Sequence, residues 1–192
     1  MLSIPQIILY LLHSSLHTAP NRVKVSLLRS TLSSPPHNLP NVVLSLDDFY
    51  LTHTDQESLA KSQPDNPLVQ HRGQPSTHDL PLLISTLESL KERWLTQLPR
   101  YDKSAFSGAG DRTDSSTWEQ VNEPETPSIE VVILEGWCVG FRPLSNYDLE
   151  HKWLSAREKE ESGHGNGQLG KLKLEDVFFV NDKLKEYDSV TE

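Results

Sequence analysis

Apolar residues gather in short runs and in helical repeats along this chain. Residues 42–46 and 129–134 are rich in Val, Leu and Ile, as are strands that a parallel sheet buries on both faces. Residues 6–12 form another short apolar run that suits a strand. A helix is predicted for residues 80–98, because Asp79 is a good N-cap and large apolar side chains then recur every three or four residues: Leu83, Leu87, Leu90, Trp94 and Leu98.

Three further helices are predicted. Residues 23–32 suit a short one, residues 146–161 a charged and exposed one, and residues 174–187 an amphipathic one built on Leu174, Val177, Phe178 and Leu184. Residues 99–128, rich in Gly, Ser, Thr, Pro and Asp, predict a long loop, and residues 162–172 predict a flexible glycine-rich linker. The order of strand, helix, loop and strand predicts one α/β domain over residues 1–192 with a parallel central sheet.

Composition narrows the classes of partner. A net charge of -9, from 18 basic and 27 acidic residues, disfavours binding to nucleic acid and to anionic membranes. No stretch reaches the roughly 18 apolar residues of a membrane span, so no membrane partner is expected. The single cysteine, Cys138, cannot form an intrachain disulfide, which fits a cytoplasmic location. Residues 1–46 hold no acidic residue and loosely resemble a transit peptide, which leaves an organelle as the alternative. No pattern indicates an oligomeric state.

Acidic residues follow both buried runs. Asp47 and Asp48 come after the first run, and Glu135 comes after the second. Because the carboxyl ends of parallel strands meet at one edge of a sheet, Asp47 and Glu135 are expected to face one crevice. There, one acid could take a proton from an attacking hydroxyl and the other could hold hydrated magnesium. Acids after strands are also common turn formers and helix caps, and this structural interpretation stays open.

Two segments add candidate anion-binding residues. HRGQPSTHD, residues 71–79, places Arg72 and His78 just before the predicted helix, where backbone N–H groups favour anions. The alternatives there are a plain turn or a metal site formed by His71 and His78. The segment PRYDKSAFSGAGDR, residues 99–112, contains two glycines and three basic residues, Arg100, Lys103 and Arg112. It is a local basic loop that could receive an anion.

Four motifs, taken together and in this order, carry a family resemblance. VLSLDDFYLTH, RGQPSTHD, YDKSAFSGAGDR and VVILEGWCVGF resemble D-glycerate 3-kinase and its fungal ATP-dependent kinase relatives, among the P-loop kinases that include uridine kinase, phosphoribulokinase and pantothenate kinase. The resemblance covers roughly residues 27–187. It implies a P-loop NTPase-like, three-layer α/β fold. It also implies Mg²⁺-assisted transfer of phosphate from ATP to a hydroxyl of a small hydroxy acid such as D-glycerate.

The resemblance also implies roles for individual residues. Asp47 matches the base, and Glu135 matches the acid near magnesium. Lys103 and Arg112 are expected to hold the acceptor's carboxylate, because both supply donors and positive charge. The residues that match the acceptor site, which makes residues 99–128 an acceptor-site loop, are Tyr50, Arg72, His78, Tyr101, Lys103 and Arg112.

The phosphate-binding loop is where the sequence departs from these kinases. They carry a Walker A loop, G-x-x-x-x-G-K-[ST], before the first helix, whereas residues 1–22 form an atypical N-terminus and no glycine precedes Gly73. GNGQLGKL, residues 165–172, matches the glycines and the lysine but ends in Leu172, which offers magnesium no hydroxyl. We therefore expect a kinase-like domain truncated at both ends, without Walker A and without a C-terminal lid and strand.

Two alternatives to an active kinase remain at this point. One is a catalytically inactive fragment or interaction module that does not bind ATP. The other is a metal-dependent hydrolase that uses Asp47, Asp48, Glu135 and the histidines.

Overall fold

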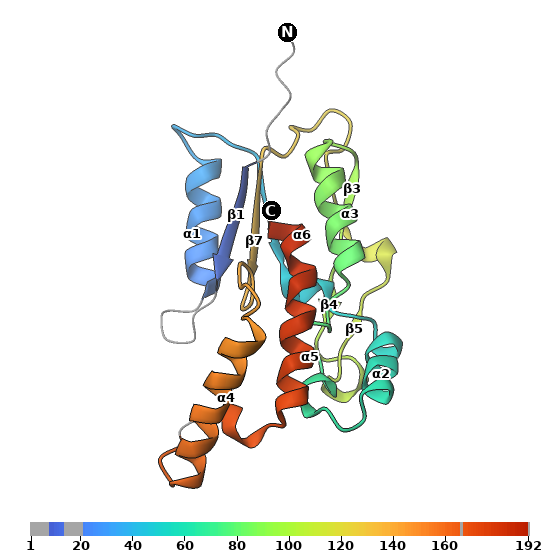
Figure 1. Ribbon diagram of the computed structural model, residues 1–192. Coiled ribbons are helices and arrows are strands. Elements are labelled where there is room, and N and C mark those ends of the chain that lie inside the picture. Colours follow the sequence, from blue (N-terminus) through green and yellow to red (C-terminus); the bar gives the residue numbers. More distant parts are fainter. Residues whose placement is uncertain (1–7, 14–20, 166, 192) are drawn as a thin grey trace.

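The computed structural model describes residues 8–13, 21–165 and 167–191, and in this part of the chain a three-stranded parallel sheet forms the centre (Figure 1). The strands are β1 (Ile8–His13), β2 (Asn41–Ser45) and β7 (Val131–Gly136), in the order β1-β7-β2. Both outer strands pair with β7 in parallel register, with Ser45 opposite Glu135. The predicted α/β class with a parallel sheet is confirmed.

Helices cover both faces of the sheet. On one face, Leu32 of α1 (Asn21–Ser33) packs with Val131 and Ile133. On the other face, Val132 and Leu134 belong to a larger core that includes side chains of α3 (Leu80–Lys91), α5 (Leu174–Leu184) and α6 (Asp188–Thr191). Alternate β7 side chains therefore enter different cores, which explains why the whole run is apolar.

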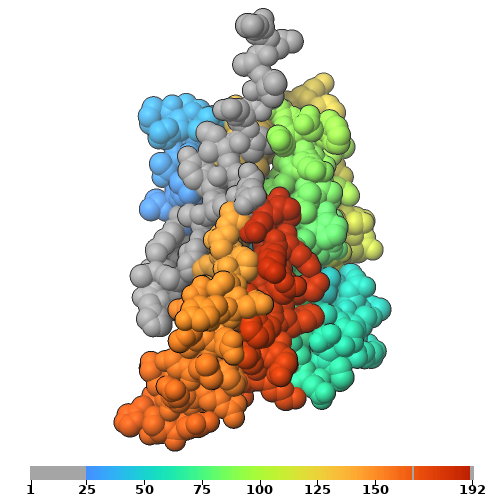
Figure 2. Space-filling view, in the orientation of Figure 1, coloured from blue at the N-terminus to red at the C-terminus, as the bar shows by residue number. Residues whose placement is uncertain are grey.

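The C-terminal helices are packed against several other elements. Figure 2 shows the C-terminal residues lying between α4 (Asn146–Glu161) on one side and the segments of α2 (His53–Ser62) and α3 on the other. Helix α5 contacts α4 and the short helix η2 (Pro67–Val69), and α6 contacts α3. A one-turn helix, η6 (Lys185–Tyr187), joins α5 to α6 and buries Tyr187. Within the described residues, no helix is long and apolar enough to cross a membrane.

Helix α3 begins as predicted but ends early. The Asp79 side chain accepts a hydrogen bond from Leu82 N at 3.0 Å, and the helix stops at Lys91 instead of continuing to residue 98. Arg93 then adopts a positive φ of 58°, and Thr96–Leu98 forms strand β3, which pairs with β6 (Glu119–Val121). The helix prediction for residues 92–98 was wrong. Strand β3 buries Leu98, so the burial of this apolar side chain does not require a helix.

Residues 99–128, for which the sequence predicted a long loop, contain several short regular elements. They include the short antiparallel pair β4 (Tyr101–Asp102) and β5 (Asp111–Arg112). Two one-turn helices, η3 (Phe106–Gly108) and η4 (Ser115–Thr117), lie in the same segment. We call residues 101–112 the acceptor hairpin.

The glycine-rich segment 162–172 lies against α4. It contains the one-turn helix η5 (Leu169–Lys171), and Gly170 is so close to α4 that an added Cβ would lie 2.5 Å from the Ala156 carbonyl oxygen. The segment predicted as a flexible linker therefore contains a packed one-turn helix at residues 169–171. The predicted replacement of the phosphate loop falls largely on residues 1–7 and 14–20, which lie outside the described residues.

Candidate active site

The carboxyl ends of β2 and β7 place acidic residues at one edge of the sheet. Beyond Ser45, the one-turn helix η1 (Leu46–Phe49) carries Asp47, while Glu135 lies opposite Ser45 on β7. Helix η1 approaches the end of β7 so closely that a Cβ at Gly136 would lie 2.7 Å from Leu46 Cβ. Glycine at this position therefore allows the two strand ends to come together. Among the described residues, Glu135 has no side-chain hydrogen bond to the groups around Asp47.

Asp47 is held by two side chains from different parts of the chain. Lys103 Nζ donates to Oδ2 at 2.6 Å, and the Tyr50 hydroxyl donates to Oδ1 at 2.9 Å. Burial raises the pKa of Asp47, but the hydrogen bonds from Lys103 and Tyr50 and the positive charge of Lys103 outweigh burial and leave that pKa below its ordinary value. Asp47 is therefore ionised at neutral pH.

The neighbouring residue, Asp48, holds two parts of the chain together. Its side chain pairs with Arg100 Nη1 at 3.1 Å and accepts a hydrogen bond from Tyr101 N at 3.2 Å. Burial raises the pKa of Asp48 and exceeds the lowering by these two partners. Asp48 thus fastens the start of the acceptor hairpin to η1 through contacts distant in sequence, which is neither of the turn and cap roles that the sequence left open.

A buried aromatic group lies behind Asp47. The rings of Tyr50 and His78 stack at 4.6 Å, and a β-bridge joins the backbones of these two residues. His78 Nδ1 lies 2.5 Å from the hydroxyl of Tyr187. Burial lowers the pKa of His78 to about 4, so the imidazole is neutral at pH 7. Sequence reasoning missed Tyr187, because as the last residue of an amphipathic pattern it carried no signal beyond its apolar ring.

Arg72 holds the tip of the acceptor hairpin. Its Nη1 donates to the carbonyl oxygens of Gly108, at 2.8 Å, and of Ala109, and its guanidinium lies over the Tyr101 ring at 5.7 Å. Gly110 sits under both side chains, since an added Cβ would lie 2.5 Å from Tyr101 Cε1 and 2.9 Å from Arg72 Nη1. Arg72 therefore shapes the loop that carries Lys103.

Arg112 joins the acceptor hairpin to two other elements. Its Nη2 donates to Asp79 Oδ2 at 2.8 Å and to the Tyr50 carbonyl at 3.0 Å. Asp79 is the cap of α3, so one guanidinium links β5, α3 and the residue that bonds Asp47. The indole N–H of Trp137, just after β7, donates to the Gly73 carbonyl at 2.7 Å and fixes the segment that leads to His78.

The described residues contain no group of three or more His, Cys, Asp or Glu side chains able to hold a metal ion. The metal-dependent hydrolase that uses Asp47, Asp48, Glu135 and the histidines stays a prediction. Magnesium in kinases does not require such a group, because it is bound by one or two carboxylates and keeps several waters. A single acid at the strand edge, such as Glu135, fits that requirement.

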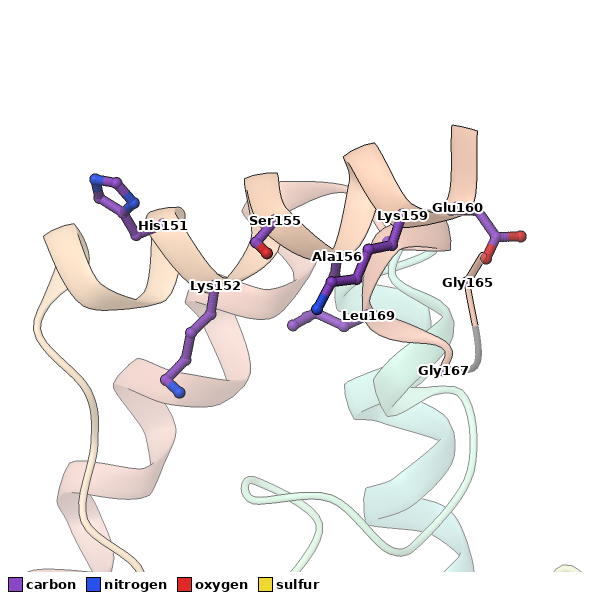
Figure 3. A pocket seen from close by; sticks show the side chains of 10 residues that line it. His151, Lys152, Ser155, Ala156, Lys159, Glu160, Gly165, Gly167 and Leu169 are labelled. Atoms are coloured by element: carbon purple, nitrogen blue, oxygen red, sulfur yellow. The ribbon is translucent and has the colours of Figure 1, made fainter. Parts of the chain in front are cut away.

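A cavity of about 550 Å³ lies elsewhere, between α4 and the glycine-rich segment (Figure 3). Its walls include Lys152, Lys159 and Leu169, and they include none of the residues gathered around Asp47. The candidate active site is therefore located by its hydrogen-bonded side chains and not by this cavity.

No protein-family model matches the sequence. The chain is, however, 42% identical to the uncharacterized kinase mug58 of Schizosaccharomyces pombe over 151 residues, which are 78% of this chain and 49% of that protein. It is 47% identical over 108 residues to the chloroplastic D-glycerate 3-kinase of Arabidopsis thaliana, covering 54% of this chain and 23% of that one. Identity to the protein named Probable ATP-dependent kinase TDA10, from Saccharomyces cerevisiae, is 42% over 106 residues, covering 52% and 34%.

Structural comparison agrees with these similarities. The solved structure of D-glycerate 3-kinase from Cryptococcus neoformans superposes with a TM-score of 0.79 and 36% identity, covering 97% of this chain and 60% of that one. The chain thus spans about half or less of the three sequence relatives. It is homologous to kinases, which are phosphotransferases. Among kinases, its relatives are D-glycerate 3-kinase and fungal ATP-dependent kinases, and the resemblance predicted from the four motifs is confirmed.

Proposed function

We propose that this chain is the acceptor-binding and base-bearing part of an ATP-dependent kinase that phosphorylates a hydroxyl of a small hydroxy acid such as D-glycerate. The observation that carries the proposal is Asp47, kept ionised at the sheet edge by Lys103 and Tyr50 in a chain homologous to kinases. A P-loop NTPase-like fold belongs to the same proposal.

Asp47 acts as the base. An ionised carboxylate offers about four acceptor positions, and Lys103 and Tyr50 occupy two of them. An acceptor hydroxyl can therefore donate to Asp47 and lose its proton to this group as the phosphate is transferred. Its lowered pKa keeps Asp47 ionised at neutral pH, so this carboxylate is ready to accept the proton of the hydroxyl that it orients.

Lys103 and Arg112 supply positive charge for the acceptor's carboxylate. The Lys103 ammonium has three donors, of which Asp47 takes one, and its side chain is 56% exposed and free to reach a ligand. Arg112 is fixed by Asp79 and by the Tyr50 carbonyl, so its charge has a set position. Tyr50, Tyr101, Arg72 and His78 complete the proposed acceptor site.

Glu135 is the residue that we propose for magnesium. It lies at the carboxyl edge of the middle strand, the position where ligands of parallel sheets bind. Magnesium would neutralise charge on the transferring phosphate when it is bound with ATP.

The test is an assay for D-glycerate phosphate and ADP with Mg-ATP and D-glycerate, by ³¹P NMR. The Cryptococcus neoformans D-glycerate 3-kinase serves as the positive control, and other small hydroxy acids are tried in turn. Formation of a phosphorylated hydroxy acid that is lost in Asp47→Asn supports the proposal. If the positive control turns over and this chain phosphorylates no hydroxy acid, it is not a kinase by itself.

A second candidate function is a module that keeps the acceptor site without binding ATP. The observation that favours it is the absence of glycine from residues 14–20, which connect β1 to α1 where a P-loop kinase holds phosphate. A thermal melt separates the two candidates. A ligand at 100 times its dissociation constant stabilises a protein by about 2.7 kcal/mol, so Mg-ATP raises the melting temperature only if the chain binds it.

A further inference from the structure

The cavity between α4 and the glycine-rich segment has the size of a small-molecule site. Its volume of about 550 Å³ falls within the range of about 300 to 1,000 Å³ that is usual for ligand pockets. One wall is a single face of α4 from His151 to Glu160, and the facing wall includes Gly165, Gly167 and Gly170. A wall with three glycines leaves room for a ligand where side chains would otherwise fill the space.

The glycine-rich wall is held against α4 by specific contacts. The indole N–H of Trp153 donates to the Leu172 carbonyl at 2.9 Å, and the Arg157 guanidinium lies over the Trp153 ring at 5.3 Å. An added Cβ at Gly170 would lie 2.5 Å from a carbonyl oxygen of α4, so the two backbones are in close contact there. Residues 169–172 therefore give the cavity a fixed side.

The charges on the cavity walls are positive in balance, although the whole chain carries a net charge of -9. Lys152 and Lys159 each supply an ammonium group, and neither forms an ion pair or a side-chain hydrogen bond with the described residues. Of the described residues that line the cavity, Glu160 is the single acid, and its Oε1 pairs with Lys171 Nζ at 3.5 Å. The cavity thus keeps two positive charges that no carboxylate in the described part of the chain neutralises.

The sequence of α4 leaves these two lysines without helical ion-pair partners. Arg157, which does not line the cavity, pairs with a glutamate four residues later at 3.2 Å, as exposed helix residues commonly do. Lys159 has only serine, alanine and glycine three and four residues away. Lys152 has one acid at that spacing, Asp148, but this carboxylate bonds the N-cap serine of α4 at 2.6 Å. Helix stabilisation therefore does not account for this pair of lysines.

The two lysine side chains lie on the same side of α4. Figure 3 shows both of them on the side that faces Leu169, with the Lys159 side chain running back along the helix toward Lys152. Their backbones are seven residues apart, or about 10 Å along a helix, a span that two long side chains can close around one ligand. The Ser155 hydroxyl lies on the turn between them.

We propose that this cavity binds a small molecule that carries two or more negative charges on phosphate groups. Lys152 and Lys159 supply the two charged contacts, and Ser155 supplies a hydroxyl donor. Lysine is a flexible point-charge partner for phosphate, so two lysines suit a ligand with several charged oxygens better than a single carboxylate. The inference goes beyond the proposed function, because none of these residues belongs to the site around Asp47.

Nuclear magnetic resonance of the unmodified chain tests the site. Inorganic pyrophosphate, added without magnesium, should shift the amide resonances of Ser155, Leu169 and Gly170 to saturation. It should bind about tenfold more tightly than inorganic phosphate, because it can engage both lysines. Shifts that grow linearly without saturation, or equal affinities for the two anions, would show an ordinary solvated charged surface and overturn the proposal.

ADP distinguishes the sources of the phosphate groups. An affinity equal to that of pyrophosphate supports a site for the phosphate groups of any small molecule, and a higher affinity supports a site for nucleotides. In either case the shifts should appear at the same amides of α4 and the glycine-rich segment. Shifts by ADP and pyrophosphate that are confined to residues around Asp47 would refute the proposal.

Lysine variants test the location. Lys152→Met and Lys159→Met should each weaken pyrophosphate binding about tenfold, because each removes one charged contact and keeps the apolar stem. Lys91→Met, at an exposed lysine of α3 outside the cavity, is the matched control and should bind as the unmodified chain does. Unchanged affinity in both cavity variants refutes the proposal, and loss of binding in Lys103→Met would then place the anion at the candidate active site.

Discussion

At the scale of single residues, two adjacent carboxylates differ because their partners differ. Asp47 meets a lysine and a phenol, and its pKa is lowered, whereas Asp48 meets an arginine and a backbone N–H, and burial raises its pKa. The side chains of both ion pairs are partly exposed to solvent, and solvent screening weakens the contribution of such pairs to stability. The difference between the two residues therefore concerns function more than folding.

Replacing Asp47 by Asn should abolish most phosphate transfer. The amide cannot take a proton, and a general base contributes about 10² to 10⁴ in rate, so kcat should fall by at least about 100-fold. The measurement is steady-state ADP release at saturating acceptor. Asp65→Asn, at an exposed aspartate outside the site, is the control. Retention of more than half of kcat in Asp47→Asn would remove Asp47 from the role of base.

Two glycines of the acceptor hairpin provide a matched pair. Both have positive φ, +96° at Gly108 and +85° at Gly110, but only Gly110 would bring a Cβ into contact with Tyr101 and Arg72. Gly108→Ala should cost about 1 kcal/mol for backbone strain, and Gly110→Ala at least about 1 kcal/mol more. Urea unfolding monitored by circular dichroism measures both. Equal losses would mean that the hairpin moves aside without cost.

At the scale of elements, the acceptor hairpin is fixed by its links to neighbouring elements. It is anchored to η1 through Asp48 and to the N-terminus of α3 through the ion pair of Arg112 with Asp79. Its two strands have two residues each, too few to hold their geometry alone. The position of Lys103 therefore depends on side chains of other elements.

Asp79 should matter more than an ordinary helix cap. Asp79→Ala removes the bond to Leu82 N and leaves Arg112 without its carboxylate, so it should cost about 2 kcal/mol of unfolding free energy. Ser145→Ala removes only the N-cap of α4 and should cost about 1 kcal/mol. Asp79→Asn, which keeps a capping oxygen but loses the charge, should fall between them. Chemical denaturation of the three variants gives the order, and equal values for Asp79→Ala and Ser145→Ala would contradict it.

Elements that a local run of similar residues defines could be predicted from the sequence, and elements set by tertiary packing could not. Strands β2 and β7 and helix α4 were visible because a continuous apolar run or a long charged segment defines them locally. The end of α3 was not, since Trp94 and Leu98 continue the helical spacing although Trp94 is 63% exposed and Leu98 is buried in a strand. The strands of the acceptor hairpin could not be predicted, because two-residue strands are too short to show an alternating pattern of apolar and polar residues.

At the scale of the whole molecule, the candidate site is assembled from segments spread along the chain. The sequence motifs are sufficient to group Asp47, Tyr50, His78 and Lys103, because each lies in a distinctive local sequence. Tyr187 joins them only through the packing of the C-terminal helices, and no local pattern reports such a contact. Its hydroxyl could be found only in three dimensions.

The buried imidazole should make folding stability depend on pH. The pKa of His78 is about 4 in the folded chain and 6.5 ordinarily, so the unfolded chain binds the proton first as pH falls. Stability from this group is complete above pH 6.5 and declines toward pH 4, by up to about 3 kcal/mol. The negative charge of Asp47 raises the pKa of His78 and so moderates the loss.

Urea unfolding between pH 7 and pH 4.5 tests this dependence. The decline in unfolding free energy should be smaller in His78→Gln than in the unmodified chain, and unchanged in His151→Gln, where the imidazole is exposed. The difference between variants removes the contribution of the many other acids that titrate in this range. Identical pH slopes for His78→Gln and the unmodified chain would mean that His78 does not stay neutral when folded.

The hydrogen bond from Trp137 to Gly73 gives the molecule a built-in optical probe. The indole is fastened to the carbonyl of the segment that carries Arg72 and His78, directly beyond the strand that carries Glu135. Its fluorescence therefore responds to any movement of that segment. With the other three tryptophans replaced by phenylalanine, the emission of Trp137 would follow acceptor entry in real time, with no label attached.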